Sequence, residues 1–201
     1  MNDASGIAPN PIAATRMLLV EGREEEIFFD ALLGHLGITG VQVERYNGKS
    51  NLAPFLKALK NRSGFAQVVK LSILRDGDDD PVGAESSVAN AIAQAAFEAE
   101  LTVKTLILPG GTQVGALENL CLQSIAGQPI ESCVEEYMSC AALATGHSHT
   151  TTTNKAKARV HAWLAAQPRP DLRLGNAAAA GLIDWSSPAF DQLKAFVRDL
   201  A

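Results

Sequence analysis

Cysteine is scarce in this chain of 201 residues, and its few occurrences form no framework. Cys121, Cys133 and Cys140 are odd in number and show no C-x-x-C spacing, which argues against a disulfide scaffold. We therefore expect three reduced, mostly buried thiols, as in an intracellular protein.

Signals for export, membrane insertion and general polyanion binding are also lacking. Residues 1–14 have no basic start and no continuous apolar run, so they do not resemble a signal peptide and are expected to form a mobile tail. No stretch is long and apolar enough to span a bilayer, which predicts a cytoplasmic protein without membrane association. The net charge is -5, so any polyanion must be held by local basic groups or by bound metal.

The sequence does contain short apolar runs, and these alternate with segments of helical periodicity. Strands are predicted over residues 17–20, 41–46, 68–74 and 104–108, and helices over 24–36, 51–61 and 84–100. This alternation predicts an α/β fold with a central, mostly parallel four-stranded sheet flanked by helices.

The second half of the chain shows helical patterns and no convincing strand. Helices are predicted over residues 115–126, 130–144, 154–166 and 188–200. We therefore predict an α/β core over residues 15–126 and a mainly helical C-terminal extension over 127–201 that packs on this core.

Carboxylates follow the predicted strands at the points where they end. Glu21 follows the first strand, Asp76 and Asp78 follow the third, and Glu118 lies after the fourth, with Glu25 one helical turn beyond Glu21. Ligands of open parallel sheets bind at the carboxyl ends of the strands. A cluster of carboxylates repels itself and is tolerated when a hard cation neutralises it. The pattern therefore predicts a site for Mg²⁺ or Mn²⁺.

A simpler interpretation exists for the Asp-Gly-Asp-Asp-Asp-Pro segment over residues 76–81. Aspartate is a good helix-capping residue, so the segment taken alone is typical of a solvated turn before a helix. Asp79 in particular is out of phase with the Asp76–Asp78 pair, and we expect it to be solvated. An EF-hand is excluded, because Pro81 and Ser87 occupy the positions that require glycine and glutamate.

The segments LLVEGREEE and LSILRDGDDD resemble the Toprim domain, which has Glu-Gly after its first strand and Asp-x-Asp after a later one. Together with NGKSNL, GALENLCL and KARVHAWLA, they most resemble a Toprim-related family of unassigned function near the OLD-type nucleases. The resemblance implies a Toprim/Rossmann-like fold. It also implies a Mg²⁺- or Mn²⁺-dependent nuclease or phosphoryl-transfer enzyme that acts on nucleic-acid phosphodiesters.

The resemblance also implies roles for individual acidic residues. Glu21 matches the Toprim glutamate, Asp76 and Asp78 match the Asp-x-Asp pair, and Asp80 matches a third acidic position. Glu25 and Glu118 resemble further acidic residues of OLD-type enzymes. The implied metal ligands are Glu21, Glu25, Asp76, Asp78, Asp80 and Glu118, and Glu21, Asp76 and Asp78 are implied to be catalytic.

Four basic residues complete the predicted site. OLD-type enzymes use a late lysine in catalysis, and both Lys155 and Lys157 are candidates for it. Lys49 lies in a turn, NGKSN, at the same edge of the sheet; it and Arg75 are candidate phosphate contacts. The turn is not a P-loop, because Val43 stands where the upstream glycine would be.

Other functions remain open at this point. A topoisomerase needs a nucleophilic tyrosine and is disfavoured: Tyr46 ends a predicted strand and Tyr137 lies in a helical segment with apolar neighbours, so both are expected to be structural. A non-catalytic Toprim-like module is the main alternative; it would bind nucleic acid, a nucleotide or a protein partner such as an ATPase. A hydrolase that acts on another kind of phosphate ester is a weaker alternative.

Overall fold

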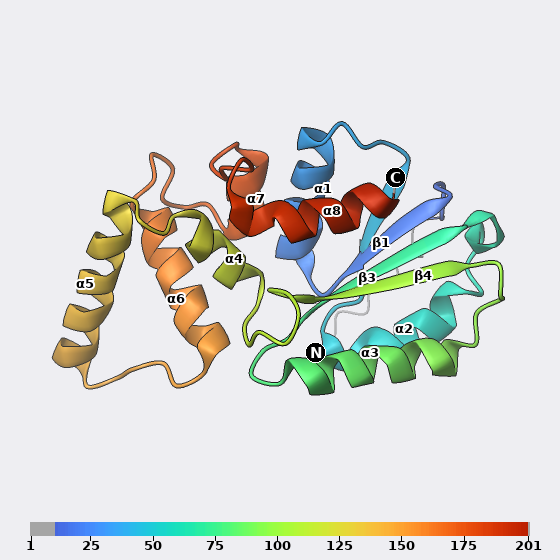
Figure 1. Ribbon diagram of the computed structural model, residues 1–201, viewed down its shortest axis with the longest axis horizontal. Helices are drawn as coiled ribbons and strands as arrows, with labels where there is room; N and C mark the ends of the chain where they lie inside the picture. Colours follow the sequence, from blue (N-terminus) through green and yellow to red (C-terminus); the bar gives the residue numbers. More distant parts are fainter. Residues whose placement is uncertain (1–10, 201) are drawn as a thin grey trace, which may run out of the picture.

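The computed structural model describes residues 11–200 and contains one four-stranded, all-parallel sheet. Its strands are β1 (Arg16–Val20), β2 (Val41–Arg45), β3 (Lys70–Asp76) and β4 (Thr102–Leu108), in the order β2-β1-β3-β4. The predicted α/β fold with a central parallel sheet is thus confirmed (Figure 1). β3 runs two residues further than its apolar run, so Asp76 is itself the last residue of a strand.

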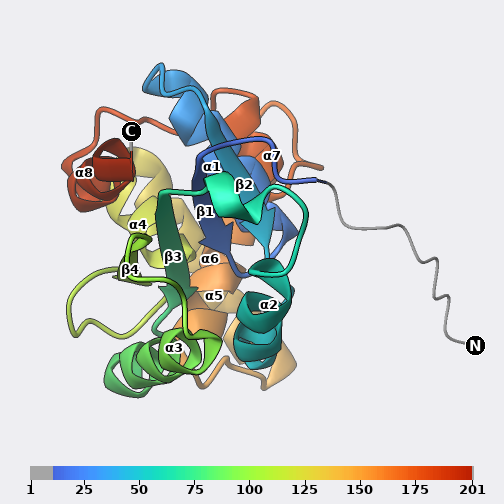
Figure 2. The same cartoon turned by 90° about the vertical axis from the view of Figure 1, so that its right-hand side faces the viewer.

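Helices cover both faces of this sheet (Figures 1 and 2). One face carries α2 (Leu52–Leu59) and α3 (Pro81–Ala95). The other carries α1 (Arg23–His35), α4 (Leu117–Ser124), α7 (Leu174–Ala179) and α8 (Asp191–Leu200). The hairpin of α5 (Pro129–Thr145) and α6 (Thr152–Ala165) lies beyond α4, away from the sheet (Figure 1). Short 3₁₀ turns occupy Lys49–Asn51, Phe65–Gln67 and Pro188–Phe190. None of the helices within residues 11–200 is long and apolar enough to cross a membrane.

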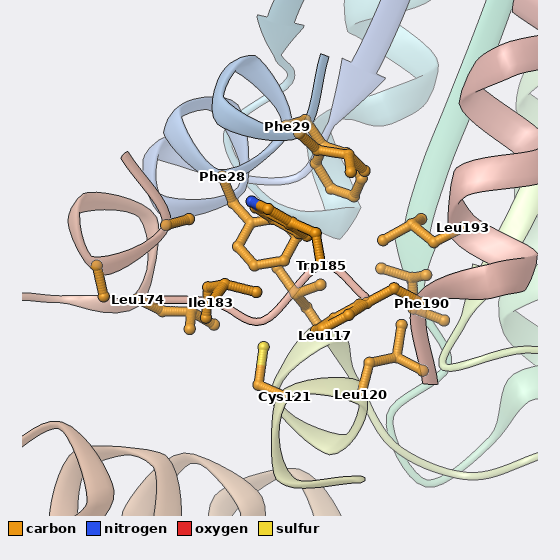
Figure 3. Close-up of a cluster of buried hydrophobic side chains, with 14 of the residues drawn as sticks. Phe28, Phe29, Leu117, Leu120, Cys121, Leu174, Ile183, Trp185, Phe190 and Leu193 are labelled. Carbon is orange, nitrogen blue, oxygen red and sulfur yellow. The ribbon is translucent and has the colours of Figure 1, made fainter. Parts of the chain in front are cut away.

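The period-two geometry of the strands divides the core into two parts. Along β1, Leu18 and Val20 join the cluster under α1, α4, α7 and α8, whereas Met17 and Leu19 join the cluster under α2 and α3. All four side chains are fully buried. The predicted C-terminal extension has no separate core, because its residues complete the first cluster (Figure 3).

Both ends of α3 differ from the predicted ends, because local backbone and capping interactions fix where this helix begins and ends. α3 begins at Pro81 rather than Ala84, because the side chain of Asp80 accepts a hydrogen bond from the backbone of Gly83 and caps the helix. It ends at Ala95 rather than at residue 100, because Ala96 adopts a left-handed conformation with φ of 49°. The six-residue helix α7 was not predicted, since its alanine-rich sequence carries little hydrophobic periodicity.

Two expectations about the surface need correction. Residues 11–14 were expected to belong to a mobile tail, yet Ile12 is buried and its backbone N–H donates to the carbonyl of Ser63; residues 1–10 lie outside the described part of the chain. Cys121 is buried as expected, but Cys133 and Cys140 are exposed. They lie on α5, whose one buried residue within the described chain is Val134.

Gly175 allows α7 to approach α1 closely, which leads to a stability prediction. A Cβ atom at this position would lie 2.4 Å from the backbone oxygen of Glu24 and 3.0 Å from the Cβ of Ile27. Gly175→Ala is therefore expected to lower the free energy of unfolding by about 1–3 kcal/mol, as overpacking does. Urea denaturation would measure this loss.

Gly34, on the same pair of helices, provides the matched control. A Cβ atom there would meet nothing within 4 Å, so Gly34→Ala should raise stability by about 0.5–1 kcal/mol through helix propensity. Equal effects of the two substitutions would contradict the close approach at Gly175.

Candidate functional site

Five carboxylates from separate segments meet beyond the carboxyl ends of β1 and β3. We call this group the acidic edge. It comprises Glu21, Glu25, Asp76, Asp78 and Glu118. Their proximity is visible in their electrostatics: besides burial, the charges of Glu118, Glu25 and Glu21 raise the pKa of Asp76, and the charges of Glu25 and Asp78 raise those of Glu21 and Glu118. The parallel strand order explains the meeting, since every strand ends on the same side.

Asp76 is the most buried member, at 8% exposure. Its Oδ1 accepts a hydrogen bond of 3.1 Å from the backbone N–H of Leu117, the first residue of α4. Burial, followed by the negative charges of Glu118, Glu25 and Glu21, holds the pKa of Asp76 well above its usual range. Charge at this position is therefore costly without a compensating cation.

Glu21 and Glu25 approach each other across Gly22, where β1 passes into α1. A Cβ atom at Gly22 would lie 2.9 Å from Oε2 of Glu25, so glycine leaves the space that this carboxylate occupies. Burial and then the charges of Glu25 and Asp78 raise the pKa of Glu21, although Arg75 acts in the opposite direction. Glu25 thus faces the acidic edge.

The neighbours of Glu25 in the first turn of α1 serve other contacts. Glu24 accepts from the backbone of Gly175 at 3.0 Å, and Glu26 pairs with Arg45 at 2.6 Å. These two carboxylates join α1 to α7 and to β2. Among the first-turn glutamates, only Glu25 acts on the acidic residues at the strand ends.

Asp78 forms the outer rim of the acidic edge and is held on three sides. Its backbone exchanges two hydrogen bonds with Gly115, of 2.8 and 2.7 Å, and its φ is 50°. Its Oδ2 accepts from Nζ of Lys49 at 3.0 Å, and its Oδ1 accepts from Oγ1 of Thr153 at 3.1 Å. Thr153 was missed by the sequence analysis.

Asp80 does not join the acidic edge, contrary to the role implied for it. It is exposed, and its Oδ1 accepts from the backbone of Gly83 at 2.9 Å as the cap of α3. The capping interpretation is therefore correct for Asp80. Asp79 is exposed, as expected, and accepts a hydrogen bond from the backbone of Thr152.

The four basic candidates occupy different places. Burial raises the pKa of Glu118, and the positive charge of Lys157 opposes this rise, whereas Lys155 lines a groove between α5 and α6. The helical spacing explains the difference, because Lys157 lies one turn after Thr153 on the side of α6 that meets Asp78. This spacing is the signal that would have revealed Thr153.

Lys49 and Arg75 differ in access. The side chain of Lys49 is 57% exposed and lies at the rim. Arg75 is largely enclosed: its Nη1 lies 3.4 Å from the carbonyl of Ala84, and its Nε is buried with no hydrogen-bond partner within residues 11–200. Arg75 therefore acts as an internal counter-charge for Glu21, and the accessible cations at this edge are Lys49 and Lys157.

The donor set suits a hard cation, but its present arrangement is open. Carboxylate oxygens are the ligands that Mg²⁺ and Mn²⁺ prefer. Across residues 11–200, however, no three Asp, Glu, His or Cys side chains are arranged to hold an ion as they stand.

The raised pKa of Glu21 predicts a pH dependence in the metal-free protein. A carboxyl whose pKa is higher in the folded state stabilises the fold below its ordinary pKa, about 4.3, and loses this contribution as pH rises through the folded-state value. Glu21→Gln lacks this group. In EDTA, its stability relative to wild type should therefore increase from pH 4 to pH 8, as followed by thermal unfolding. A relative stability independent of pH would contradict the shift.

Comparisons with known proteins cover most of the chain. The model of the family described as "Protein of unknown function (DUF3226)" matches residues 15–201. Comparison with curated proteins gives no match.

Two solved structures are among those similar to this chain. The C-terminal region of the Burkholderia pseudomallei OLD protein is 15% identical, with 94% of this chain and 100% of that chain covered and a TM-score of 0.48. The C-terminal region of the Xanthomonas campestris pv. campestris OLD protein is 18% identical, with 92% and 95% covered and a TM-score of 0.45.

Proposed function

Given that the chain belongs to the DUF3226 family of proteins of unknown function, we propose that it is a Mg²⁺- or Mn²⁺-dependent phosphodiesterase that acts on nucleic acid. One observation carries this proposal. Carboxylates from the ends of β1 and β3 and from α1 and α4 crowd at one edge, where burial and then their negative charges raise the pKa values of Glu21, Asp76 and Glu118. Such a charge cluster is costly unless a cation offsets it.

The position of each residue in the acidic edge indicates its role in binding the metal ion. Asp76 and Glu21 would hold the cation at the strand ends, with Asp78 and Glu118 closing the rim. When bound, the metal would polarise a phosphodiester oxygen and lower the pKa of a water molecule. Glu25, whose charge acts on Glu21, Asp76 and Glu118, would serve as a further ligand.

The basic side chains would receive the substrate. Lys157, on α6, acts on the charge of Glu118, and Lys49 pairs with Asp78. Both are exposed, so they can contact the phosphate oxygens and offset the charge that develops on them. Thr153 orients Asp78 through its hydroxyl, and Arg75 neutralises part of the charge of Glu21 from within.

The direct test is cleavage of DNA and RNA by the purified protein in Mg²⁺ or Mn²⁺. We expect metal-dependent cleavage by wild type and a loss of at least about 100-fold in Glu21→Gln/Asp76→Asn, because this variant removes two of the proposed ligands. Asp79→Asn, an acidic residue outside the acidic edge, is the matched control and should cleave normally. Absence of cleavage by wild type, or equal cleavage by the double variant, would refute the proposed phosphodiesterase activity.

A non-catalytic module that binds nucleic acid, a nucleotide or a protein such as an ATPase is the second candidate. The open arrangement of the carboxylates and the pairing of Asp78 with Lys49 favour it. This module would bind its ligand equally well in Asp78→Asn and in wild type, and would cleave nothing. Electrophoretic mobility shifts with short DNA and RNA, recorded beside the cleavage assay, separate the two candidates.

A further inference from the structure

A cavity of about 750 Å³ lies between α1, α7 and the segment over residues 183–186. Its walls are partly apolar, with Ile27 and Ala31 from α1, Ala178 from α7 and Ile183 from the segment that follows. Pockets for small molecules usually have about 300–1,000 Å³ and combine such walls with a few polar groups. The polar groups of this cavity therefore indicate what it can bind.

Two carboxylates line the cavity, Asp30 from α1 and Asp184, and its lining contains no lysine or arginine. Within residues 11–200, Asp30 accepts no hydrogen bond and forms no ion pair. Burial, followed by the negative charge of Glu26, raises the pKa of Asp30. A positively charged group in the cavity would relieve this unfavourable charge.

The nearby lysine does not supply that charge, because it serves other contacts. Lys194 pairs with Asp191 at 2.8 Å and donates to the carbonyl of Trp185 at 2.9 Å. Asp184 accepts from the hydroxyl and the backbone N–H of Ser186, at 2.6 and 3.0 Å, through Oδ1 alone. Its Oδ2 thus keeps its capacity to accept a hydrogen bond from a ligand.

Trp185 adds an unsatisfied donor to the lining. The residue is only 7% exposed, and its indole Nε1 donates to no group within the described chain. Across residues 11–200, the one fully buried side-chain nitrogen or oxygen without a partner is Nε of Arg75, so solvent reaches the indole nitrogen.

The orientation of the indole places this donor beside α1. The ring centroid of Trp185 lies 5.0 Å from that of Phe28 and 6.0 Å from that of His35, so the ring extends along the helix. Figure 3 shows the nitrogen on the edge of the ring that points toward α1. Because α1 and Trp185 both line the cavity, the indole N–H is available to an acceptor there.

We propose that this cavity binds an apolar α-amino acid. The ammonium group of the ligand would pair with Asp30, and its carboxylate would accept hydrogen bonds from the indole of Trp185 and the imidazole of His35. Its apolar side chain would lie against Ala31 and Ile183. A simple amine would leave the indole N–H unpaired, and a simple acid would leave Asp30 without a cation, so the zwitterion is the ligand that satisfies both.

The cavity is independent of the proposed phosphodiesterase site. None of its lining residues belongs to the acidic edge. Amino-acid binding therefore requires no metal, and it stands even if the proposed function fails.

Titration of the ¹⁵N-labelled full chain with leucine, followed by ¹H–¹⁵N NMR, tests the site. The indole resonance of Trp185, assigned with Trp185→Phe, should shift saturably with a Kd of about 1 mM or tighter. The indole of Trp163, which does not line the cavity, should not shift. Two analogues, 3-methylbutylamine without the carboxylate and 4-methylpentanoate without the amine, should each bind at least about tenfold more weakly than leucine.

Two variants with matched controls locate the contacts, with the backbone amides of Ala31 and Ala178 as reporters. Asp30→Asn should weaken leucine binding at least about tenfold, whereas Asp171→Asn, an exposed carboxylate outside the lining, should not. Trp185→Phe removes the donor and should also weaken binding. Tyr137, which we expected to be structural, is 61% exposed on α5, so Tyr137→Phe removes a polar group elsewhere and should change nothing.

Either of two results would overturn the proposal. The first is the absence of a saturable shift with leucine, valine and phenylalanine alike, because the cavity would then take no apolar amino acid. The second is binding that is equally strong in wild type and in Asp30→Asn, because the ammonium group would then lie elsewhere. Asp30 is exposed, so this variant tests the contact without disturbing the core.

Discussion

Asp76→Asn is expected to weaken Mn²⁺ binding by more than about 100-fold, beyond the 10–100-fold loss typical of residues that only support a ligand. The metal-free protein should nevertheless be as stable as wild type or more so. Asparagine has nearly the same shape, its Oδ1 can still accept the hydrogen bond from Leu117, and it removes a charge that Glu118, Glu25 and Glu21 oppose. Electron paramagnetic resonance of free Mn²⁺ measures the binding, and thermal unfolding in EDTA measures the stability.

Asp80→Asn is the matched control for this experiment. Asp80 lies in the same turn but caps α3, and asparagine is an equally good capping residue. Both Mn²⁺ binding and stability should therefore be unchanged. If Asp76→Asn bound Mn²⁺ like wild type, or if Asp80→Asn weakened binding equally, the assignment of Asp76 as a ligand would be wrong.

Phe28→Ala is expected to cost about 3–5 kcal/mol of unfolding free energy, the usual range for a buried aromatic side chain. Phe28 is fully buried, and its ring centroid lies 5.0 Å from that of Trp185 and 6.3 Å from that of Phe190 (Figure 3). The substitution removes the aromatic contacts of α1 with Trp185 and Phe190 of the C-terminal segment. Because Glu25 is one turn before Phe28, the variant should also bind Mn²⁺ more weakly.

Phe97→Ala provides the comparison for Phe28→Ala. Phe97 is half-buried on the other side of the sheet, where it stacks on Phe65 at 5.6 Å. Its removal should cost at most about 2 kcal/mol and leave Mn²⁺ binding unaffected. Chemical denaturation measures the unfolding free energy of both variants. Equal losses of unfolding free energy would contradict the larger contribution that we assign to the cluster around Trp185.

The C-terminal half shows where sequence patterns reach their limit. Its helices α5 and α6 were predicted from their periodicity, but the pattern did not reveal that α5 is largely exposed. Helix α7 escaped prediction because its alanine-rich sequence has little hydrophobic periodicity, and the packing of its Gly175 on Glu24 joins residues far apart in the sequence. Such contacts leave no local signal.

The acidic turn over residues 76–80 also shows a difference between what the sequence predicts and what the structure decides. Asp76, Asp78, Asp79 and Asp80 are chemically alike, and the sequence favoured Asp76, Asp78 and Asp80 as ligands. The structure turns Asp80 back onto α3 as its cap, and it points Asp78 toward Lys49 and Thr153. The direction of each side chain depends on the left-handed φ of Asp78 and on the backbone bridge to Gly115.

By itself, the sequence determined the parallel sheet and the edge at which the carboxylates gather, because strand periodicity and the residues that follow each strand are local properties. Only the tertiary structure distinguished Lys157 from Lys155 at this edge, and only it brought Thr153 to Asp78, across 75 positions of the chain. The physical reason is that α6 can present either lysine until its packing fixes which side faces the sheet. That packing is set by buried contacts with α4 and α5, which no single segment encodes.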